Sequence, residues 1–236
     1  MKVTLWGIAF DKLTVEKAAH KVLELTKSEK GAYVVTPNTE ILARARDTDF
    51  SAVLSGADLT LCDGVGVSAL ALARFRYLPR VTGIDLAEKL LEKAAKQKIP
   101  VFLYGAAPGV AKRAKDKLEA KYQGLGIVGV CHGFESEDLA LDLIRQSGAK
   151  IVFVCTSCPK QEFFARKASQ NGINAVFLAL GGVLDVFSGD KKRAPKAFRV
   201  LGLEWAYRFA KEPWRIKRFA KSLKVGTINQ KFTNRP

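Results

Sequence analysis

Short apolar segments alternate with amphipathic segments along most of the chain. Runs rich in β-branched residues predict strands at 2–6, 32–36, 59–63, 100–105, 126–130, 150–155 and 174–180. Apolar positions at helical spacing predict helices at 15–27, 39–46, 86–98, 108–122, 137–146 and 160–171. Nearly all-apolar strands separated by helices are typical of a parallel sheet covered on both faces. The pattern therefore predicts an α/β fold, a Rossmann-like, mostly parallel sheet with helices on both faces.

Glycine and polar residues gather where the predicted strands end. The strand ends are 36–40, 63–66, 105–109, 131–134, 155–162 and 181–185. Ligands of open α/β sheets bind beyond the carboxyl ends of the strands. This edge of the sheet is therefore the expected binding site.

Two strand ends carry candidate chemistry. Asp63 follows a strand and could act as a general base on a sugar hydroxyl, although Asp is also favoured as a helix N-cap. Gly105 and Gly109 lie between a strand and a helix, where backbone N–H groups could approach a phosphate or merely form a tight turn. Neither a Walker loop nor a dinucleotide-binding fingerprint is present.

Metal and thiol chemistry have weaker support. Asp47-x-Asp49 resembles a metal-binding pair, but it follows a helix, which favours a turn and an N-cap. No metal or other cofactor is expected. Cys155-x-x-Cys158 precedes a helix and could form a redox pair or, with Cys62 and Cys131, a zinc site. Small buried cysteines are the favoured interpretation, and a redox or zinc protein is the alternative from a different class.

Composition is that of a folded protein, and its charge is unevenly distributed. The 236 residues are 48% hydrophobic and 26% charged, which excludes a disordered chain. The net charge of +16 divides into +4 for residues 1–190 and +12 for residues 191–236. No apolar run is long enough to span a bilayer, and the start does not resemble a signal peptide. A cytoplasmic location follows as the expectation.

The basic C-terminal segment is also amphipathic and aromatic. Pro213 opens a predicted helix in which Ile216, Phe219, Ala220 and Leu223 form an apolar stripe flanked by Lys and Arg. Such a helix suits the headgroup region of an anionic membrane. A helix that packs on the core with a solvated basic face is the alternative. Nucleic acid is not an expected partner, because no binding motif is present and the rest of the chain is nearly neutral.

Eight short motifs together resemble the WecG/TagA/CpsF glycosyltransferase family. In chain order they are Thr-Pro-Asn at 36–38, Asp-Gly-Val-Gly at 63–66, Arg-Val-Thr-Gly-Ile-Asp at 80–85, Gly-x-x-Pro-Gly-Val at 105–110, Pro-Lys-Gln-Glu at 159–162, Gly-Gly-Val-Leu-Asp at 181–185, Arg-Ala-Pro at 193–195 and Leu-Glu-Trp-x-Tyr-Arg at 203–208. The resemblance implies a catalytic domain at 1–193 and a membrane-docking C-terminal helical appendage at 194–236.

The same resemblance implies an activity and a set of site residues. The reaction would be inverting, metal-independent transfer of N-acetylmannosamine from UDP to undecaprenyl-diphosphate-linked GlcNAc, or of another UDP-sugar such as ManNAcA or glucose. By motif, Asp63 would be the base and Thr36 a second catalytic residue. Substrate-binding roles fall on Asn38, Arg80, Thr82, Gly83, Gly105, Gly109, Gln161, Glu162, Gly181, Gly182 and Asp185. Diphosphate or membrane contacts fall on Arg193, Arg208, Arg215 and Arg218.

One motif departs from the family pattern. Residues 155–159 read Cys-Thr-Ser-Cys-Pro where the family has a glycine-rich stretch, so the donor sugar is the least determined part of the prediction. The expected partners are the UDP-sugar, the lipid-linked acceptor and an anionic membrane surface on its cytoplasmic side. A homo-oligomer is left open, because an exposed tail could pack between subunits.

Overall fold

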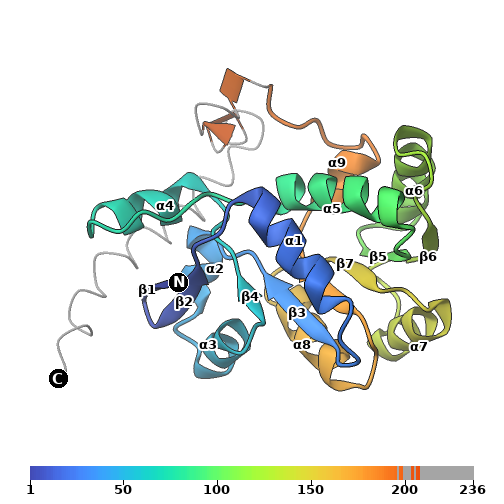
Figure 1. The fold of residues 1–236 in the computed structure, drawn as a ribbon, viewed down its shortest axis with the longest axis horizontal. Coiled ribbons are helices and arrows are strands. Elements are labelled where there is room, and N and C mark those ends of the chain that lie inside the picture. The colour runs from blue at the N-terminus through green and yellow to red at the C-terminus, as the bar shows by residue number, and fades with distance from the viewer. Residues whose placement is uncertain (196, 199–202, 205, 208–236) are drawn as a thin grey trace.

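A six-stranded parallel sheet forms the centre of the molecule (Figure 1). A computed structural model describes residues 1–195, 197–198, 203–204 and 206–207. The strands lie in the order β4-β3-β8-β7-β5-β6 and all pair in parallel. Their bounds are β3 Ala32–Val35, β4 Leu59–Thr60, β5 Val101–Gly105, β6 Ile127–Cys131, β7 Ile151–Cys155 and β8 Val176–Ala179. The predicted α/β class with a mostly parallel sheet is confirmed.

Helices cover both faces of this sheet and enclose a hydrophobic core on each. One core is built from α1 (Val15–Leu25), α5 (Gly83–Gln97), α6 (Val110–Lys121) and α9 (Val183–Phe187). The other is built from α2 (Thr39–Arg44), α3 (Thr48–Ser55), α4 (Val65–Leu72), α7 (Glu137–Ser147) and α8 (Lys160–Gln170). Every residue of β3, β5, β7 and β8 is buried, which is why these strands read as continuous apolar runs.

The strand predicted at 2–6 lies outside the main sheet. Residues Lys2–Leu5 form β1, which pairs antiparallel with β2 (Ile8–Asp11) in a separate two-stranded sheet. The two strands are joined by Trp6 and Gly7, both with positive φ. A two-residue loop with two positive φ values matches the twist of a hairpin, and a parallel connection needs a much longer crossover. The interpretation of 2–6 as a strand of the parallel sheet is therefore wrong.

Helix caps place several predicted site residues at the edge of the sheet. Asn38 caps α2 by accepting a hydrogen bond from Ile41 N, and Thr82 caps α5 by accepting one from Asp85 N. Asp47 caps α3, as expected for the Asp47-x-Asp49 turn. Asp63 is not the N-cap of α4, because Gly64 holds that position.

Part of the predicted C-terminal appendage lies outside the described residues. This applies to Trp205, Arg208, Arg215 and Arg218 and to the helix predicted after Pro213. None of the helices within the described ranges is long and apolar enough to cross a membrane.

Candidate active site

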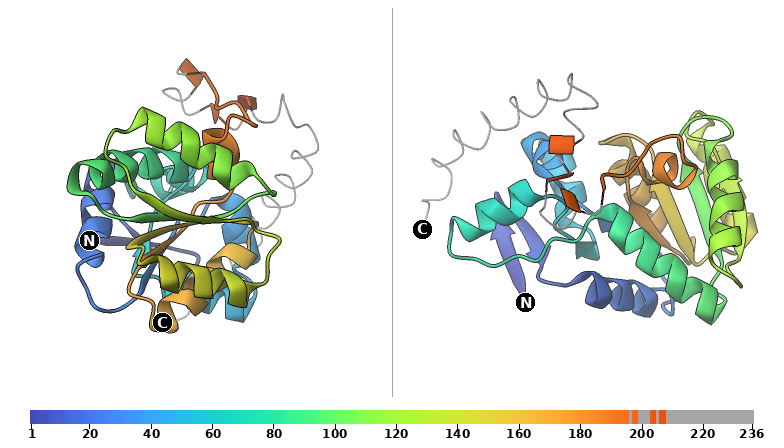
Figure 2. Two further views of the ribbon diagram at one scale, coloured as in Figure 1. Left: turned by 90° about the vertical axis from the view of Figure 1, so that its right-hand side faces the viewer. Right: turned by 90° about the horizontal axis from the view of Figure 1, so that it is seen from above.

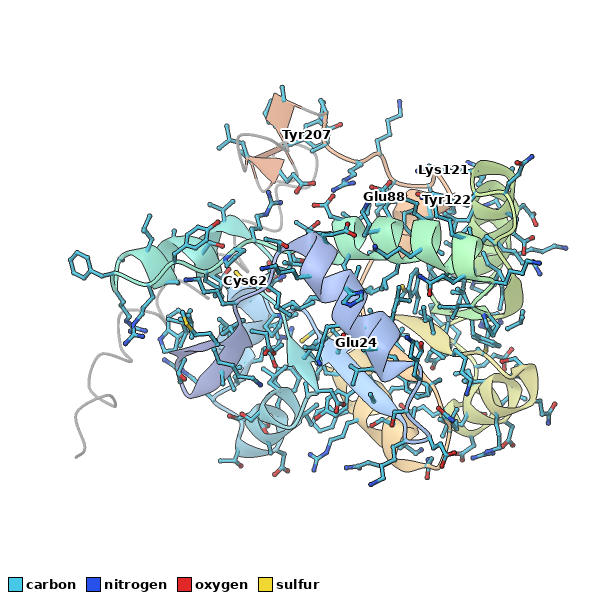
Figure 3. All side chains as sticks on the ribbon, in the orientation of Figure 1. Glu24, Cys62, Glu88, Lys121, Tyr122 and Tyr207 are labelled. Carbon is cyan, nitrogen blue, oxygen red and sulfur yellow. The ribbon has the colours of Figure 1, made fainter. Side chains whose placement is uncertain are left out.

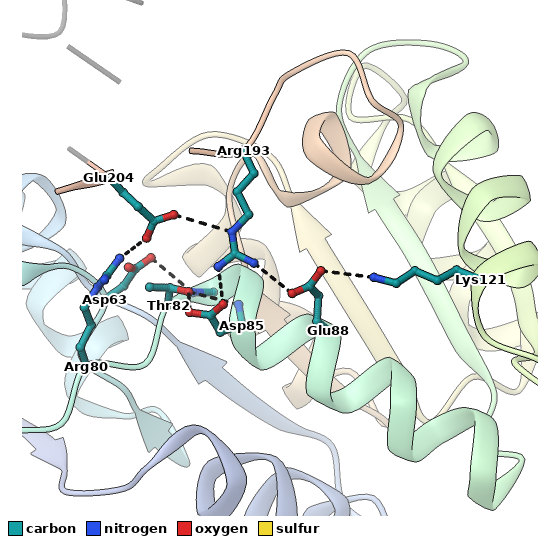
Figure 4. Close-up of polar contacts among 9 residues, drawn as sticks. Asp63, Arg80, Thr82, Asp85, Glu88, Lys121, Arg193 and Glu204 are labelled. Carbon is teal, nitrogen blue, oxygen red and sulfur yellow. Dashed lines mark hydrogen bonds and ion pairs between the residues drawn. The ribbon is translucent and has the colours of Figure 1, made fainter. Parts of the chain in front are cut away.

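Asp63 lies where three loops meet at the carboxyl edge of the sheet. Its backbone N–H donates to Pro37 O at 3.2 Å, which ties the segment after β4 to the loop after β3. Its Oδ2 accepts a hydrogen bond from the backbone N–H of Gly83 at 3.4 Å, at the start of α5 (Figure 4). A helix N-terminus carries partial positive charge, which attracts a carboxylate oxygen. Asp63 is thus a carboxylate on rigid backbone, as a general base must be.

Thr36 and Gly83 pack together beside Asp63. The buried Thr36 hydroxyl donates to Ala179 O at 3.1 Å, which joins the ends of β3 and β8. A Cβ on Gly83 would stand 3.6 Å from Thr36 Oγ1 and 3.5 Å from Leu180 Cδ2. Because this spacing is ordinary van der Waals contact, the backbone of α5 begins directly against the strand ends. The structure therefore brings Thr36, Asp63 and Gly83 into one cluster.

Gln161 and Glu162 extend this cluster toward the end of β8. Gln161 Oε1 accepts from Gly181 N at 2.7 Å, and its Nε2 donates to Glu162 Oε1 at 2.8 Å. Gly181 has φ +61°, the left-handed conformation that glycine adopts without strain. Both side chains are buried, so the amide of Gln161 is held in one orientation by a backbone donor and a carboxyl acceptor.

The Glu162 carboxyl group is buried with little compensation. Its Oε2 has no hydrogen-bond partner within the described part of the chain. Burial raises the pKa of Glu162, and this outweighs the opposing hydrogen bonds from Gln161 and Cys158 and the nearby charge of Arg44. Because the folded-state pKa lies above the unfolded value, this group destabilises the fold as pH rises above about 4.5 and through the raised pKa.

We therefore expect Glu162→Gln to stabilise the protein at neutral and alkaline pH. Gln keeps an oxygen that can accept from Gln161 but has no charged form to bury. Thermal unfolding of both proteins across a pH series measures the effect. The Tm of the variant should exceed that of the wild type increasingly as pH rises, and the difference should vanish under acidic conditions. A difference that is independent of pH would contradict this account.

A second group of predicted residues lies along β5 and α9. Gly105 ends β5 with φ +125°, and Gly109 precedes α6 with φ +81°. A Cβ on Gly105 would stand 2.3 Å from Cys155 O of the adjacent strand, so only glycine allows this close approach. Asp185 on α9 is engaged by Lys191 at 2.6 Å, close to Gly182. The loop after β5 opens at the same edge as Asp63 but over the other half of the sheet, whereas α9 follows β8, which is separated from β4 only by β3.

A chain of ion pairs connects the first cluster to the C-terminal segment (Figure 4). Arg80 pairs with the buried Glu204, whose other oxygen lies 3.7 Å from Arg193 Nε. Arg193 also pairs with Asp85 and, at 2.9 Å, with Glu88. Burial opposes ionisation of Asp85, but the hydrogen bonds from Arg193 and Thr82 prevail and lower its pKa. Two predicted binding residues, Arg80 and Arg193, are thus held by carboxylates.

This network contains residues that the sequence did not single out. Its three carboxylates are Asp85, Glu88 and Glu204. Neither Glu88 nor Glu204 was a predicted site residue, although Glu204 lies in the family motif at 203–208. No spacing rule pairs residues 80 and 204, because the contact arises only when the segment after α9 crosses the start of α5. The only sequence feature that could have indicated a role for Glu204 was its position in the motif at 203–208.

The four cysteines do not form a reactive site in the described structure. Cys155 and Cys62 are buried, and Cys62 Sγ lies 3.2 Å from Ser68 Oγ where β4 leads into α4 (Figure 3). Burial raises the pKa of both Cys155 and Cys158 to about 12. A redox pair needs a lowered thiol pKa, so this pair has the opposite property. No group of three or more potential metal ligands occurs among the residues whose positions are described.

Comparison with known proteins agrees with the family resemblance of the sequence motifs. The profile described as "Glycosyl transferase WecG/TagA/CpsF family" matches residues 3–232. An N-acetylglucosaminyldiphosphoundecaprenol N-acetyl-beta-D-mannosaminyltransferase of Bacillus spizizenii strain W23 is 40% identical over 192 residues, which is 80% of this chain and 75% of the relative. The enzyme of the same name from Bacillus subtilis strain 168 is 38% identical over 191 residues, 80% of this chain and 75% of its own.

The match covers nearly the whole chain and therefore establishes the class of protein. It is a glycosyltransferase. The chain belongs to the WecG/TagA/CpsF glycosyl transferase family, as the motifs indicated.

Proposed function

We propose that this enzyme transfers N-acetylmannosamine from UDP-N-acetylmannosamine to undecaprenyl-diphosphate-linked GlcNAc, a step in building the linkage unit of wall teichoic acid. The names of the two Bacillus relatives, at about 40% identity, support the sugar and the acceptor. The observation that carries the proposal is the position of Asp63, fixed by Pro37 and Gly83 at the carboxyl edge of the sheet.

The proposed chemistry is a single displacement at the anomeric carbon. Asp63 takes the proton from the acceptor hydroxyl as its oxygen attacks C1 of the sugar. The C1–O bond to the diphosphate breaks, and UDP leaves with its electron pair, so the configuration at C1 inverts. A diphosphate leaves without a general acid, so a second catalytic carboxylate is not required. Thr36, Asn38, Gln161 and Glu162 would line the acceptor and donor-sugar site beside this centre.

The leaving diphosphate needs positive charge, which we assign to protein groups and not to a metal. The N-terminus of α6 follows Gly109, and backbone N–H groups there favour an anion. Asp185 and the Gly181-Gly182 turn, beside the same loops, would hold the nucleotide end. Arg80 and Arg193 would supply guanidinium groups to the diphosphate, and Arg208, Arg215 and Arg218 would add three more.

We further propose that 194–236 is a distinct appendage that docks on the inner face of the cell membrane. Its basic, amphipathic sequence supports this. The described part of it contacts the catalytic domain, residues 1–193, through Glu204. Binding of a diphosphate near Arg80 would then compete with Glu204, which links substrate binding to the position of the appendage. A homo-oligomer in which this segment packs between subunits is the alternative arrangement.

A donor screen tests the proposed reaction. The full-length protein is incubated with a short-chain GlcNAc-diphosphate-lipid and, separately, with the UDP forms of ManNAc, GlcNAc, ManNAcA and glucose. We expect a product larger by one N-acetylhexosamine from UDP-ManNAc, with the β configuration at its anomeric carbon by NMR. Faster turnover of another donor would show that the proposed sugar is wrong. Ser157 and Cys158, which stand where the family has a glycine-rich stretch, would then be the first residues to replace with glycine in a search for the cause of the donor preference. A retained α configuration would overturn the single displacement.

A further inference from the structure

The end of α4 carries three large apolar side chains that are more than half exposed. Leu72 is 66% exposed, Phe75 99% and Tyr77 66%. Arg74 and Arg76 alternate with them along the chain. We call residues 72–77 the α4 tip. Figure 1 and the right-hand view of Figure 2 show α4 projecting from the body of the molecule, away from the main sheet.

Helix α4 is apolar on all sides and yet only partly buried. Its sequence, Val-Gly-Val-Ser-Ala-Leu-Ala-Leu, contains no charged residue, and only Val67 and Ala71 are buried. A helix that is hydrophobic all round is normally enclosed by protein or membrane. The exposed face of α4 is therefore continuous with the apolar side chains of the tip, as a surface that meets another apolar phase would be.

Phe75 occupies a backbone position where the fold favours glycine over phenylalanine. The N–H of Arg76 donates to Ala71 O at 2.9 Å and that of Phe75 to Leu72 O at 2.8 Å, the two bonds of a Schellman motif. Phe75 has φ +56° at the position where glycine is normally found. The fully exposed ring of Phe75 contributes nothing to the core, and a positive φ is unfavourable for a residue with a side chain. Such a residue indicates a role outside the fold.

The charged residues within the α4 tip are of one sign. No Asp or Glu occurs between Asp63 and Asp85, whereas Arg74 and Arg76 lie within the tip. Arg74 lies over the ring of Trp6 at 5.5 Å, and Lys12 lies over the ring of Tyr77 at 5.4 Å. Aromatic side chains interleaved with Lys and Arg match the headgroup region of an anionic bilayer.

We propose that the α4 tip inserts into the headgroup region of an anionic phospholipid bilayer and holds the active-site edge at the membrane. Helix α4 begins two residues after Asp63 and is about 12 Å long at 1.5 Å per residue. The candidate base is therefore one short helix away from the bilayer in which a polyprenyl-linked acceptor resides. The benefit to catalysis rests on the proposed function, whereas the membrane contact itself does not.

Sedimentation with vesicles tests the contact. Full-length wild type and Phe75→Gly are mixed with vesicles of phosphatidylglycerol and phosphatidylcholine. We expect roughly tenfold weaker partitioning of the variant, the factor that corresponds to one aromatic side chain leaving an apolar phase. Because Gly suits the backbone at this position, the Tm of the variant should be equal to or above that of the wild type. Phe134→Gly, on another exposed ring (77%) after β6, is the control and should bind vesicles like the wild type.

Further arms separate the alternatives. Arg74→Glu/Arg76→Glu should weaken binding to the anionic vesicles and leave the weaker binding to pure phosphatidylcholine vesicles unchanged. If Phe75→Gly binds vesicles as well as the wild type and instead dissociates an oligomer in sedimentation velocity, the surface is a subunit interface and the proposal is overturned. Turnover with a water-soluble acceptor should be unaffected by Phe75→Gly. A wild type inactive on every acceptor would refute the proposed function and leave the vesicle result to decide the contact.

Discussion

Asp63→Asn is expected to lower kcat for sugar transfer about 10²–10⁴-fold, the usual contribution of a general base. The amide is the same size and can still accept the hydrogen bond from Gly83 N, so the site should keep its shape. It cannot take a proton from the acceptor hydroxyl. Calorimetric binding of UDP should be unchanged, because the proposed base acts on the acceptor and the proposed nucleotide-binding residues, Gly105, Gly109 and Asp185, are not altered.

Asp47→Asn is the matched control for this experiment. Asp47 caps α3 through hydrogen bonds from Asp49 N and Phe50 N, and Asn caps a helix as well as Asp does. The control should therefore retain both stability and activity. An Asp63→Asn enzyme with nearly wild-type kcat would show that another group removes the proton. Loss of UDP binding together with activity would instead indicate that the substitution disturbed the site.

Gly105→Ala is expected to destabilise the protein by about 2–6 kcal/mol, the sum of backbone strain and overpacking that each contribute about 1–3 kcal/mol. The new methyl group would stand 2.3 Å from Cys155 O and 2.4 Å from its carbonyl carbon. These atoms are backbone of the adjacent central strand and cannot move aside as a flexible side chain could. The φ of +125° adds strain for any residue with a Cβ.

Alanine substitutions at two further glycines distinguish backbone strain from overpacking. Gly126→Ala meets no atom within 4 Å and should be nearly neutral. Gly148→Ala also meets no atom, but its φ of +65° should give the strain alone. Denaturant unfolding of the three variants should rank the loss of stability as Gly105, then Gly148, then Gly126. Equal losses at Gly105 and Gly148 would mean that β5 and β7 separate to accommodate the methyl group.

The sheet and most of its helices were predictable because their signals are local. Helices α7 and α8 begin where the sequence predicts and end within one residue of the predicted boundaries. The strand at 2–6 was assigned to the wrong sheet, because its apolar pattern says nothing about its partner. The two-residue turn at Trp6 and Gly7, where both φ values are positive, is what makes this strand pair with β2 in a hairpin. Helices α3 and α4 lack a clear amphipathic pattern, so periodicity did not reveal them.

The site was predictable as a set of strand ends but not as a set of contacts. Parallel strands place their carboxyl ends at one edge, so Thr36, Asp63 and Gly181 had to lie together once the sheet was correct. That Gly83 N donates to Asp63, or that Glu162 fixes Gln161, depends on packing between segments distant in the chain. The same holds for Glu204 between Arg80 and Arg193.

The sequence by itself determined the α/β class, the edge of the sheet that holds the candidate site and the family, because hydrophobic period, strand-end composition and motif order are properties of neighbouring residues. Tertiary structure decided which charges neutralise one another, which thiols are buried, and which apolar residues remain exposed at the end of α4. Phe75 illustrates the difference. In the sequence it is one apolar residue among many, and only the folded backbone reveals a fully exposed ring in a glycine conformation. Exposure is set by everything that packs, or fails to pack, around a residue, and no local pattern contains it.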